Sequence, residues 1–264
     1  MLLIFQYVIL GIIQGITEWL PISSSGMLTL VMTNFFDVTD ISILLQQSLF
    51  LHLGTFFAVL IYFRHDVIRL IQCIFNKQEK EYRKILKFLI ITTIITSIVG
   101  LVIVFFLTAI NISLTGKAIT LGVGILLLIT GGIQLTARKK GAKNANDITN
   151  KTSVLLGATQ GLSVLPGLSR SGITVSTLLL DKFDDRTALR LSFLMSLPVV
   201  LLGNIFLNFR DITLTFTTEL FYGLLFAFVF GILTIHLLIN LAKRINFAWF
   251  AIIFGILMMI GILI

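Results

Sequence analysis

The chain contains six almost continuously hydrophobic stretches of about 20 residues, at 42–63, 86–108, 116–136, 187–208, 219–241 and 247–264. A helix rises about 1.5 Å per residue, so a stretch of this length crosses a hydrocarbon core about 30 Å thick. Two further hydrophobic regions, 2–36 and 152–180, are interrupted by serine, glycine and proline. The pattern predicts an all-α polytopic membrane protein with six full spans and two broken, re-entrant helix pairs.

The composition excludes a soluble globular domain. Hydrophobic residues make up 57% of the 264 residues and charged residues only 12%, which is about half the share of charge in soluble domains. The single cysteine, Cys73, excludes an intrachain disulfide and a cysteine-based metal site. Gly124, Gly131 and Gly132 would allow close helix packing, within one chain or in a homodimer.

The net charge of +8 follows from membrane topology and does not indicate a nucleic-acid partner. Most of the 20 lysines and arginines lie on alternate loops, in or beside 64–87, 137–151, 181–190 and 242–246. Because lysine and arginine accumulate on the cytoplasmic side, these loops are predicted to be cytoplasmic. Both termini then lie on the extracytoplasmic side of the plasma membrane, provided that each broken region enters and leaves from one side.

The two broken regions are copies of one another. A shift of 146 residues aligns LGIIQGITEWLPISSSG, from Leu10, with LGATQGLSVLPGLSRSG, from Leu156, without a gap. Each half has one broken region followed by three spans, and an odd number of crossings inverts the second half. We expect a single membrane domain, 1–264, built from inverted repeats 1–136 and 152–264 that the basic loop 137–151 joins. Such repeats place a polar site near the midplane.

Among the 12 acidic residues, only Glu18 falls at membrane depth, and Arg170 is the only basic residue to do so. Charge at this depth is costly, so both are candidate functional residues, and a purely structural ion pair is the alternative. Hydroxyl groups accompany them at Ser23, Ser24, Ser25, Ser169, Ser171 and Thr174. Arginine beside serines and glycine, in SRSG, favours phosphate binding, because guanidinium and the N–H groups of a helix start are matched donors.

A carboxylate next to bound phosphate would repel it unless the carboxylate is protonated or shares a divalent cation with the phosphate. Mg²⁺ or Ca²⁺ prefers oxygen ligands, which Glu18 and the phosphate groups would supply. Gln14 precedes Glu18 by four residues, so it lies on the same helix face and offers a neutral oxygen. We therefore expect a divalent cation held by Gln14 and Glu18.

These motifs resemble those of the integral-membrane undecaprenyl-pyrophosphate phosphatases, the family associated with bacitracin resistance. The resemblance covers the chain length, the internal repeat, QGITE with PISSSGM, PGLSRSGIT, and the span LHLGTFFAVLIYF. It implies dephosphorylation of undecaprenyl diphosphate, or another polyprenyl diphosphate, to the monophosphate, which recycles carrier lipid for cell-envelope glycans. The alternative is a flippase that moves the lipid phosphate or diphosphate between leaflets without chemistry.

The resemblance also implies roles for individual residues. Ser24 would be the nucleophile, with Glu18 and Arg170 completing the catalytic group, and Gln14 with Glu18 matches the metal or acid/base pair. The substrate phosphates would be bound by Ser23, Ser25, Gly26, Ser169, Ser171, Gly172 and Thr174.

One position departs from the family pattern. Met27 stands where the family has a histidine proposed to activate the serine, and a thioether takes no proton at physiological pH. Three replacements are open: Glu18 acts as the base, His52 packs nearby, or a metal-activated water attacks directly. A fourth possibility is that binding is kept and hydrolysis is lost.

Overall fold

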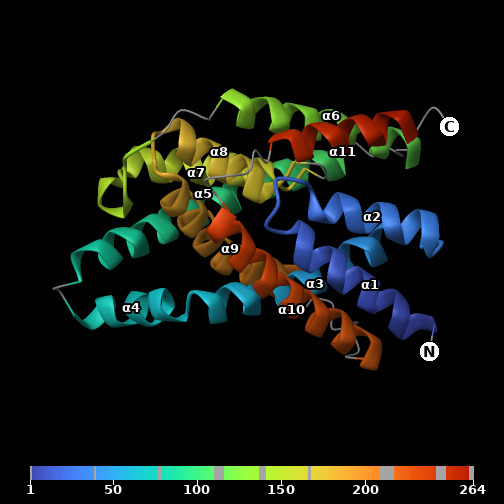
Figure 1. Ribbon diagram of the computed structural model, residues 1–264, viewed down its shortest axis with the longest axis horizontal. Helices are drawn as coiled ribbons and strands as arrows, with labels where there is room; N and C mark the ends of the chain where they lie inside the picture. Colours follow the sequence, from blue (N-terminus) through green and yellow to red (C-terminus); the bar gives the residue numbers. More distant parts are fainter. Residues whose placement is uncertain are drawn as a thin grey trace.

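The computed structural model describes residues 2–38, 40–76, 79–109, 116–136, 141–165, 168–207, 217–241 and 248–261. Residues 137–140 of the basic loop, 166–167 of the second motif and 262–264 of the last hydrophobic stretch lie outside these ranges. Within them the chain is helical and forms no β-strand beyond an isolated bridge between Lys143 and Phe183 (Figure 1).

The helices follow the hydrophobic pattern of the sequence. The six hydrophobic stretches coincide with α3, α5, α6, α9, α10 and α11, and each broken region forms a helix pair, α1 with α2 and α7 with α8. Their bounds are α1 (Leu2–Thr17), α2 (Ser24–Phe35), α3 (Ile41–Tyr62), α4 (Arg64–Phe75), α5 (Lys80–Ala109), α6 (Gly116–Thr136), η1 (Ala145–Asp147), α7 (Asn150–Leu162), α8 (Arg170–Leu180), α9 (Asp185–Leu207), α10 (Thr218–Leu241) and α11 (Ala248–Gly261).

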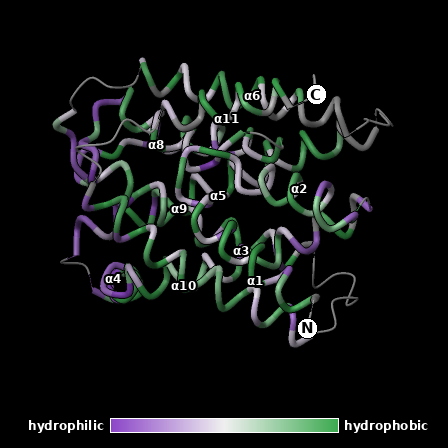
Figure 2. The backbone as a smooth tube through the Cα atoms, turned by 45° about the vertical axis from the view of Figure 1, so that its right-hand side comes forward, coloured by the Kyte–Doolittle hydropathy of each residue, from purple (hydrophilic) through white to green (hydrophobic). Residues whose placement is uncertain are grey.

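Three helices of the described chain are long and apolar enough to cross a membrane, over Lys80–Phe106, Asp185–Ile205 and Thr218–Asn240. A fourth candidate is α3 with α4, which meet at a bend of 76°. Figure 2 shows mainly hydrophobic helices, with hydrophilic segments toward both sides of the view. Length and hydropathy therefore support a helical membrane protein with three or four spans in these ranges.

In both broken pairs, a serine side chain caps the start of the second helix. Pro21, which has no N–H group to continue a helix, lies between α1 and α2. The Ser23 hydroxyl then accepts the N–H of Gly26 at 3.2 Å and caps α2. At the matching place in the second region, the Ser169 hydroxyl accepts the N–H of Gly172 at 3.1 Å and caps α8. The repeated serines thus begin two helices whose first N–H groups have no partner within the helix.

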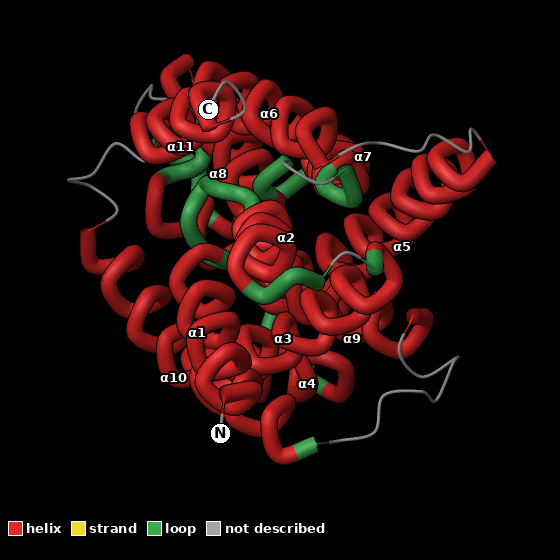
Figure 3. Tube along the Cα trace, turned by 90° about the vertical axis from the view of Figure 1, so that its right-hand side faces the viewer, coloured by secondary structure: helices red, strands yellow, loops and turns green. Residues whose placement is uncertain are grey.

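The helices of the two halves also pack in matching ways. Helix α1 lies along α10 and α7 along α5, while α3 contacts α9 and α6 lies against α11. In Figure 3, α2 is near the centre of the bundle, with α1 and α10 on one side and α6 and α11 on the other. The hydroxyls of Ser169 and Ser171 donate to the carbonyl of Leu20, at 3.2 and 2.7 Å. The start of α8 is therefore hydrogen-bonded directly to the turn before α2.

Glycines shared by the two motifs bring the helices close together. A methyl group added at Gly15 would lie 2.8 Å from the carbonyl oxygen of Ala227 on α10. A methyl group added at Gly157 would lie 2.7 Å from Cβ of Ile95 and 2.9 Å from the Thr92 oxygen, both on α5. Real side-chain carbon atoms do not approach so closely, so these positions need glycine for helix packing.

We expect Gly157→Ala to destabilise the protein by about 1–3 kcal/mol, because the α5 backbone must move to admit the methyl group. Gly122→Ala is the matched control, since nothing lies within 4 Å of its added methyl group and alanine favours helix. Thermal unfolding of both variants in detergent measures the difference. Equal midpoints for the two variants would contradict close packing of α7 on α5.

Candidate active site

The candidate site lies where the two broken pairs meet α3. Glu18 follows the last residue of α1, Ser24 is the first residue of α2, Arg170 is the first residue of α8, and His52 lies within α3. The Glu18 residue is only 5% exposed. Since α2 and α8 both begin here, the positive ends of two helix dipoles are at the site. Such an arrangement favours an anionic ligand.

Glu18 is the centre of the site. Its Oε2 atom accepts the hydroxyl of Ser24 at 2.7 Å and the side-chain amide of Gln14 at 3.0 Å, and it lies 3.1 Å from Nε2 of His52. Its Oε1 atom pairs with Nη2 of Arg170. The two charged residues that the sequence places at membrane depth are thus in direct contact, although they are 152 positions apart.

The guanidinium of Arg170 contacts Glu18 and the Trp19 ring and has one terminal nitrogen left to donate. One guanidinium nitrogen pairs with Glu18, and the guanidinium carbon lies 5.8 Å from the centre of the Trp19 ring. The second terminal nitrogen, Nη1, is buried and has no hydrogen-bond partner among the described residues. A buried donor without a partner costs about 1–3 kcal/mol, so an acceptor brought by a ligand would bind favourably here.

His52, which the sequence offered as one of three possible replacements for the motif base, also joins this cluster. It lies in LHLGT on α3, and the side chain is mostly covered. The signal in the sequence was a histidine within a hydrophobic stretch, which fits a packing role equally well. Only the packing of α3 beside the α1–α2 turn brings it to Glu18.

The other predicted hydroxyls lie around the two helix starts. Ser23 and Ser25 contact each other at 3.3 Å, and Ser169 and Ser171 repeat this contact at 3.2 Å. Ser169 and Ser171 also reach the Leu20 carbonyl, as described above. Thr174 is fully buried and exchanges a hydrogen bond of 2.7 Å with Ser192 of α9.

Met27 lies one helical turn after Ser24 and packs against Ile22 and Leu127. Its thioether is therefore part of an apolar cluster between α2 and α6. Met27 therefore offers no base at the position where the resemblance implies a histidine, whereas His52 of α3 lies 3.1 Å from Glu18.

Gln14 and Glu18, the cation ligands that the sequence predicts, are in contact with each other and with further side chains. Both oxygens of Glu18 already accept from nitrogen or hydroxyl donors, and the Arg170 cation is in contact with one of them. Gln14 Oε1 is buried without a partner in the described ranges, but one neutral oxygen is too few for a hard cation. Nor do the described side chains include a group of three histidine, cysteine or carboxylate ligands.

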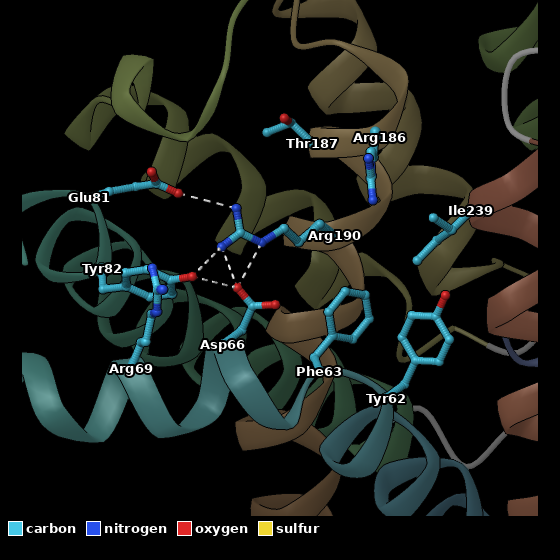
Figure 4. Close-up of a pocket in the computed structure, with 10 residues that line it drawn as sticks. All are labelled: Tyr62, Phe63, Asp66, Arg69, Glu81, Tyr82, Arg186, Thr187, Arg190 and Ile239. Atoms are coloured by element: carbon cyan, nitrogen blue, oxygen red, sulfur yellow. Dashed lines mark hydrogen bonds and ion pairs between the residues drawn. The ribbon is translucent and has the colours of Figure 1, made fainter.

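A second polar cluster lies around Arg190 of α9 (Figure 4). It borders a cavity of about 430 Å³. Arg190 pairs with Asp66 of α4 and with Glu81 of α5 at 3.2 Å, and it donates to the Tyr82 hydroxyl at 3.2 Å. Its guanidinium pairs with two carboxylates, so this cluster links α4, α5 and α9. The Glu18 cluster, where a serine hydroxyl meets a carboxylate and an arginine, is the better candidate for chemistry.

The fold and the site define a class: a helical membrane protein in which a serine and an arginine at the starts of two helices both contact a buried carboxylate. Residues 7–260 match the family described as bacitracin resistance protein BacA. The chain belongs to this family.

Similar proteins extend over nearly the whole chain. A protein of Methanococcoides burtonii named undecaprenyl-diphosphatase is 41% identical over 263 residues, which cover 97% of each chain. Proteins of the same name from Methanothrix thermoacetophila and Haloarcula marismortui are 35% and 34% identical. These matches cover 96% of this chain in both cases, and 94% and 95% of the relatives.

Proposed function

We propose that this protein is an undecaprenyl-diphosphatase, which hydrolyses undecaprenyl diphosphate to undecaprenyl phosphate and inorganic phosphate. The lipid product is carrier for another round of cell-envelope glycan synthesis. Family membership and the names of the relatives support the proposal. The observation that carries it is that Ser24 donates to Glu18 while Glu18 pairs with Arg170. The proposed nucleophile, proton acceptor and phosphate-binding cation therefore belong to one cluster.

In the first step, Arg170 holds the terminal phosphate through Nη1, together with first-turn N–H groups at the starts of α2 and α8. Ser24 Oγ forms a bond to the terminal phosphorus, and the bond from that phosphorus to the bridging oxygen breaks. The Ser24 proton passes to Glu18 Oε2, 2.7 Å away, and from there to the leaving undecaprenyl phosphate.

In the second step, water attacks the phosphorus of phosphoserine and gives its proton to Glu18. The bond between phosphorus and Ser24 Oγ breaks, and Ser24 takes the proton back. One water is consumed and one inorganic phosphate is formed for each lipid. The residues proposed to bind or orient the phosphates belong to the same two helix starts: Ser23, Ser25, Gly26, Ser169, Ser171, Gly172 and Thr174.

A divalent cation, Mg²⁺ or Ca²⁺, would be held by Gln14 and Glu18 together with oxygens of the diphosphate, because the two side chains alone offer too few ligands. Such a cation would reduce the repulsion between the diphosphate and Glu18. No step above depends on it.

For the architecture, we propose two inverted repeats, 1–136 and 152–264, joined through 137–151 into one membrane domain with six spans. The matching packing of α1 on α10 and of α7 on α5 supports this proposal, as do the equivalent serine caps. The distribution of positive charge supports extracytoplasmic termini and a plasma-membrane location. Gly124 is packed against Gly255 of α11, so it serves packing within one chain.

Lipid transport without chemistry is the less favoured alternative, because the relatives are named for hydrolysis. The deciding experiment measures inorganic phosphate and undecaprenyl phosphate formed from undecaprenyl diphosphate by the purified protein in detergent. Magnesium, calcium and chelator are compared. We expect one phosphate per lipid. No release in any of the three conditions, with lipid binding retained, would overturn the proposed hydrolysis.

A further inference from the structure

We propose that the cavity beside Arg190 binds the phosphate headgroup of an anionic phospholipid. The two groups that hold the lipid are Arg69 of α4 and Arg186 of α9. Arg190 stays paired with its own carboxylates and does not contact the lipid. The site is separate from the Glu18 cluster, so the inference does not depend on the proposed hydrolysis.

The lining of the cavity carries more positive than negative charge. Arg69, Arg186 and Arg190 border it, against the carboxylates of Asp66 and Glu81. Both carboxylates pair with Arg190. Within the ranges that the structure describes, Arg69 and Arg186 form no ion pair and their guanidinium groups donate no hydrogen bond. An anion that enters the cavity therefore meets two guanidinium groups without displacing a carboxylate from either of them.

The cavity combines these cations with aromatic and apolar surface. Figure 4 shows Arg186 pointing from α9 toward Tyr62, while Arg69 lies beside the Tyr82 ring. The guanidinium carbon of Arg69 is 5.5 Å from the centre of that ring. Ile239 of α10 adds an apolar wall. The volume of about 430 Å³ is in the range of small-ligand sites, and the mixed lining suits a group that is charged at one end and apolar at the other.

Helix α4 places the cavity at the membrane surface. The chain bends by 76° between α3 and α4, so α4 does not continue across the membrane in the direction of α3. On α4, Ile68, Ile71 and Ile74 are exposed at a spacing of three residues, whereas the helix also packs on α5. A helix with an exposed apolar face and basic residues lies in the headgroup layer of a membrane. Arg69 is then at the level of the lipid phosphates.

This position favours a lipid over a free anion. The cavity is built from the segments 62–82 and 186–190, which belong to two of the basic loops and to the helix ends beside them, together with Ile239. Basic residues gathered at one membrane surface attract anionic lipids, and each lysine or arginine there strengthens binding by about 5-fold. Inorganic phosphate would gain from the charge but not from the apolar wall.

The test counts lipids bound to the purified protein in a neutral detergent by native mass spectrometry. Phosphatidylglycerol is the probe, and phosphatidylcholine and inorganic phosphate are the comparison ligands. We expect one phosphatidylglycerol to bind at least about 10-fold more tightly than phosphatidylcholine. Replacing both Arg69→Gln and Arg186→Gln should weaken this binding by about 25-fold, because two contributions of about 5-fold are lost.

The matched control removes the same number of charges from residues that do not line the cavity. Arg83→Gln combined with Lys151→Gln alters two exposed residues of the basic loops. Its affinity for phosphatidylglycerol should stay within about 3-fold of the wild type.

A second pair of variants keeps the charge of the cavity. Arg69→Lys with Arg186→Lys should bind at least about 5-fold more tightly than the glutamine pair, because an ammonium still attracts the phosphate although it lacks the fork of a guanidinium. Thermal unfolding without lipid verifies that each variant is folded. If the glutamine pair does not fold, the lysine pair should still prefer phosphatidylglycerol to phosphatidylcholine, and the loss of that preference would contradict the site.

Four results would overturn the proposal. The first is equal binding of phosphatidylglycerol by the glutamine pair and the wild type. The second is an equal loss in the control pair, which would mean a diffuse basic surface. The third is a loss in Arg170→Lys that the glutamine pair does not show, which would place the lipid at the Glu18 cluster. The fourth is inorganic phosphate binding as tightly as phosphatidylglycerol, which would make the ligand a free anion.

Discussion

Ser24→Ala is expected to reduce phosphate release from undecaprenyl diphosphate by on the order of 10³-fold or more. The hydroxyl that this change removes is the one that lies 2.7 Å from Glu18 at the start of α2. Binding of the lipid should survive, because Arg170 and the helix starts are untouched. The measurement is steady-state release, combined with rapid quenching of a lipid labelled in its terminal phosphate.

The quenching experiment should find label on the wild-type protein and none on Ser24→Ala. Thr33→Ala is the matched control, because it deletes another hydroxyl from α2 that donates only to carbonyls of its own helix, at 2.8 and 3.3 Å. Release by Ser24→Ala at the wild-type rate would mean that water attacks the diphosphate directly.

Arg170→Ala is expected to reduce kcat/KM by about 10²- to 10³-fold, because the change removes a preorganised donor from the transferring phosphate. It also leaves the Glu18 carboxylate buried without its ion-pair partner, which costs about 3–5 kcal/mol of stability. Arg170→Lys keeps the charge but loses the forked geometry, so stability should recover further than turnover.

The loss of turnover and the loss of stability in Arg170→Ala can be separated by comparison with Arg190→Ala. Arg190 also bridges carboxylates between helices, but it does so in the α4, α5 and α9 cluster. Its loss should lower the unfolding temperature and leave phosphate release per folded molecule unchanged. Near-normal release by folded Arg170→Ala would remove Arg170 from the phosphate site.

The sequence predicted the positions of the helices, because hydrophobic stretches and their interruptions are visible without tertiary information. It also pointed to Glu18 and Arg170, since charge at membrane depth is rare enough to mark a site. The structure shows these two residues in contact. The inverted repeat itself stays a prediction that the matching helix contacts support.

Other parts of the site could not be predicted, because they depend on packing. The motif LHLGT does not reveal that α3 packs beside Glu18, so the sequence left His52 as one of several possible bases for activating Ser24. The motif glycines Gly15 and Gly157 serve contact with α10 and α5, which no spacing along the chain reveals. A serine that bonds a ligand and one that bonds a carbonyl look alike in sequence. That Ser171 donates to the Leu20 carbonyl, for example, is not visible in SRSG.

The bonds between the two motifs have a consequence for biosynthesis. Glu18 emerges from the ribosome long before Arg170, its partner in the second half of the chain. The carbonyl of Leu20 likewise accepts hydrogen bonds from Ser169 and Ser171, which are synthesised much later. Until residue 171 has been inserted, the Glu18 carboxylate lacks its arginine partner and the Leu20 carbonyl lacks its two serine donors.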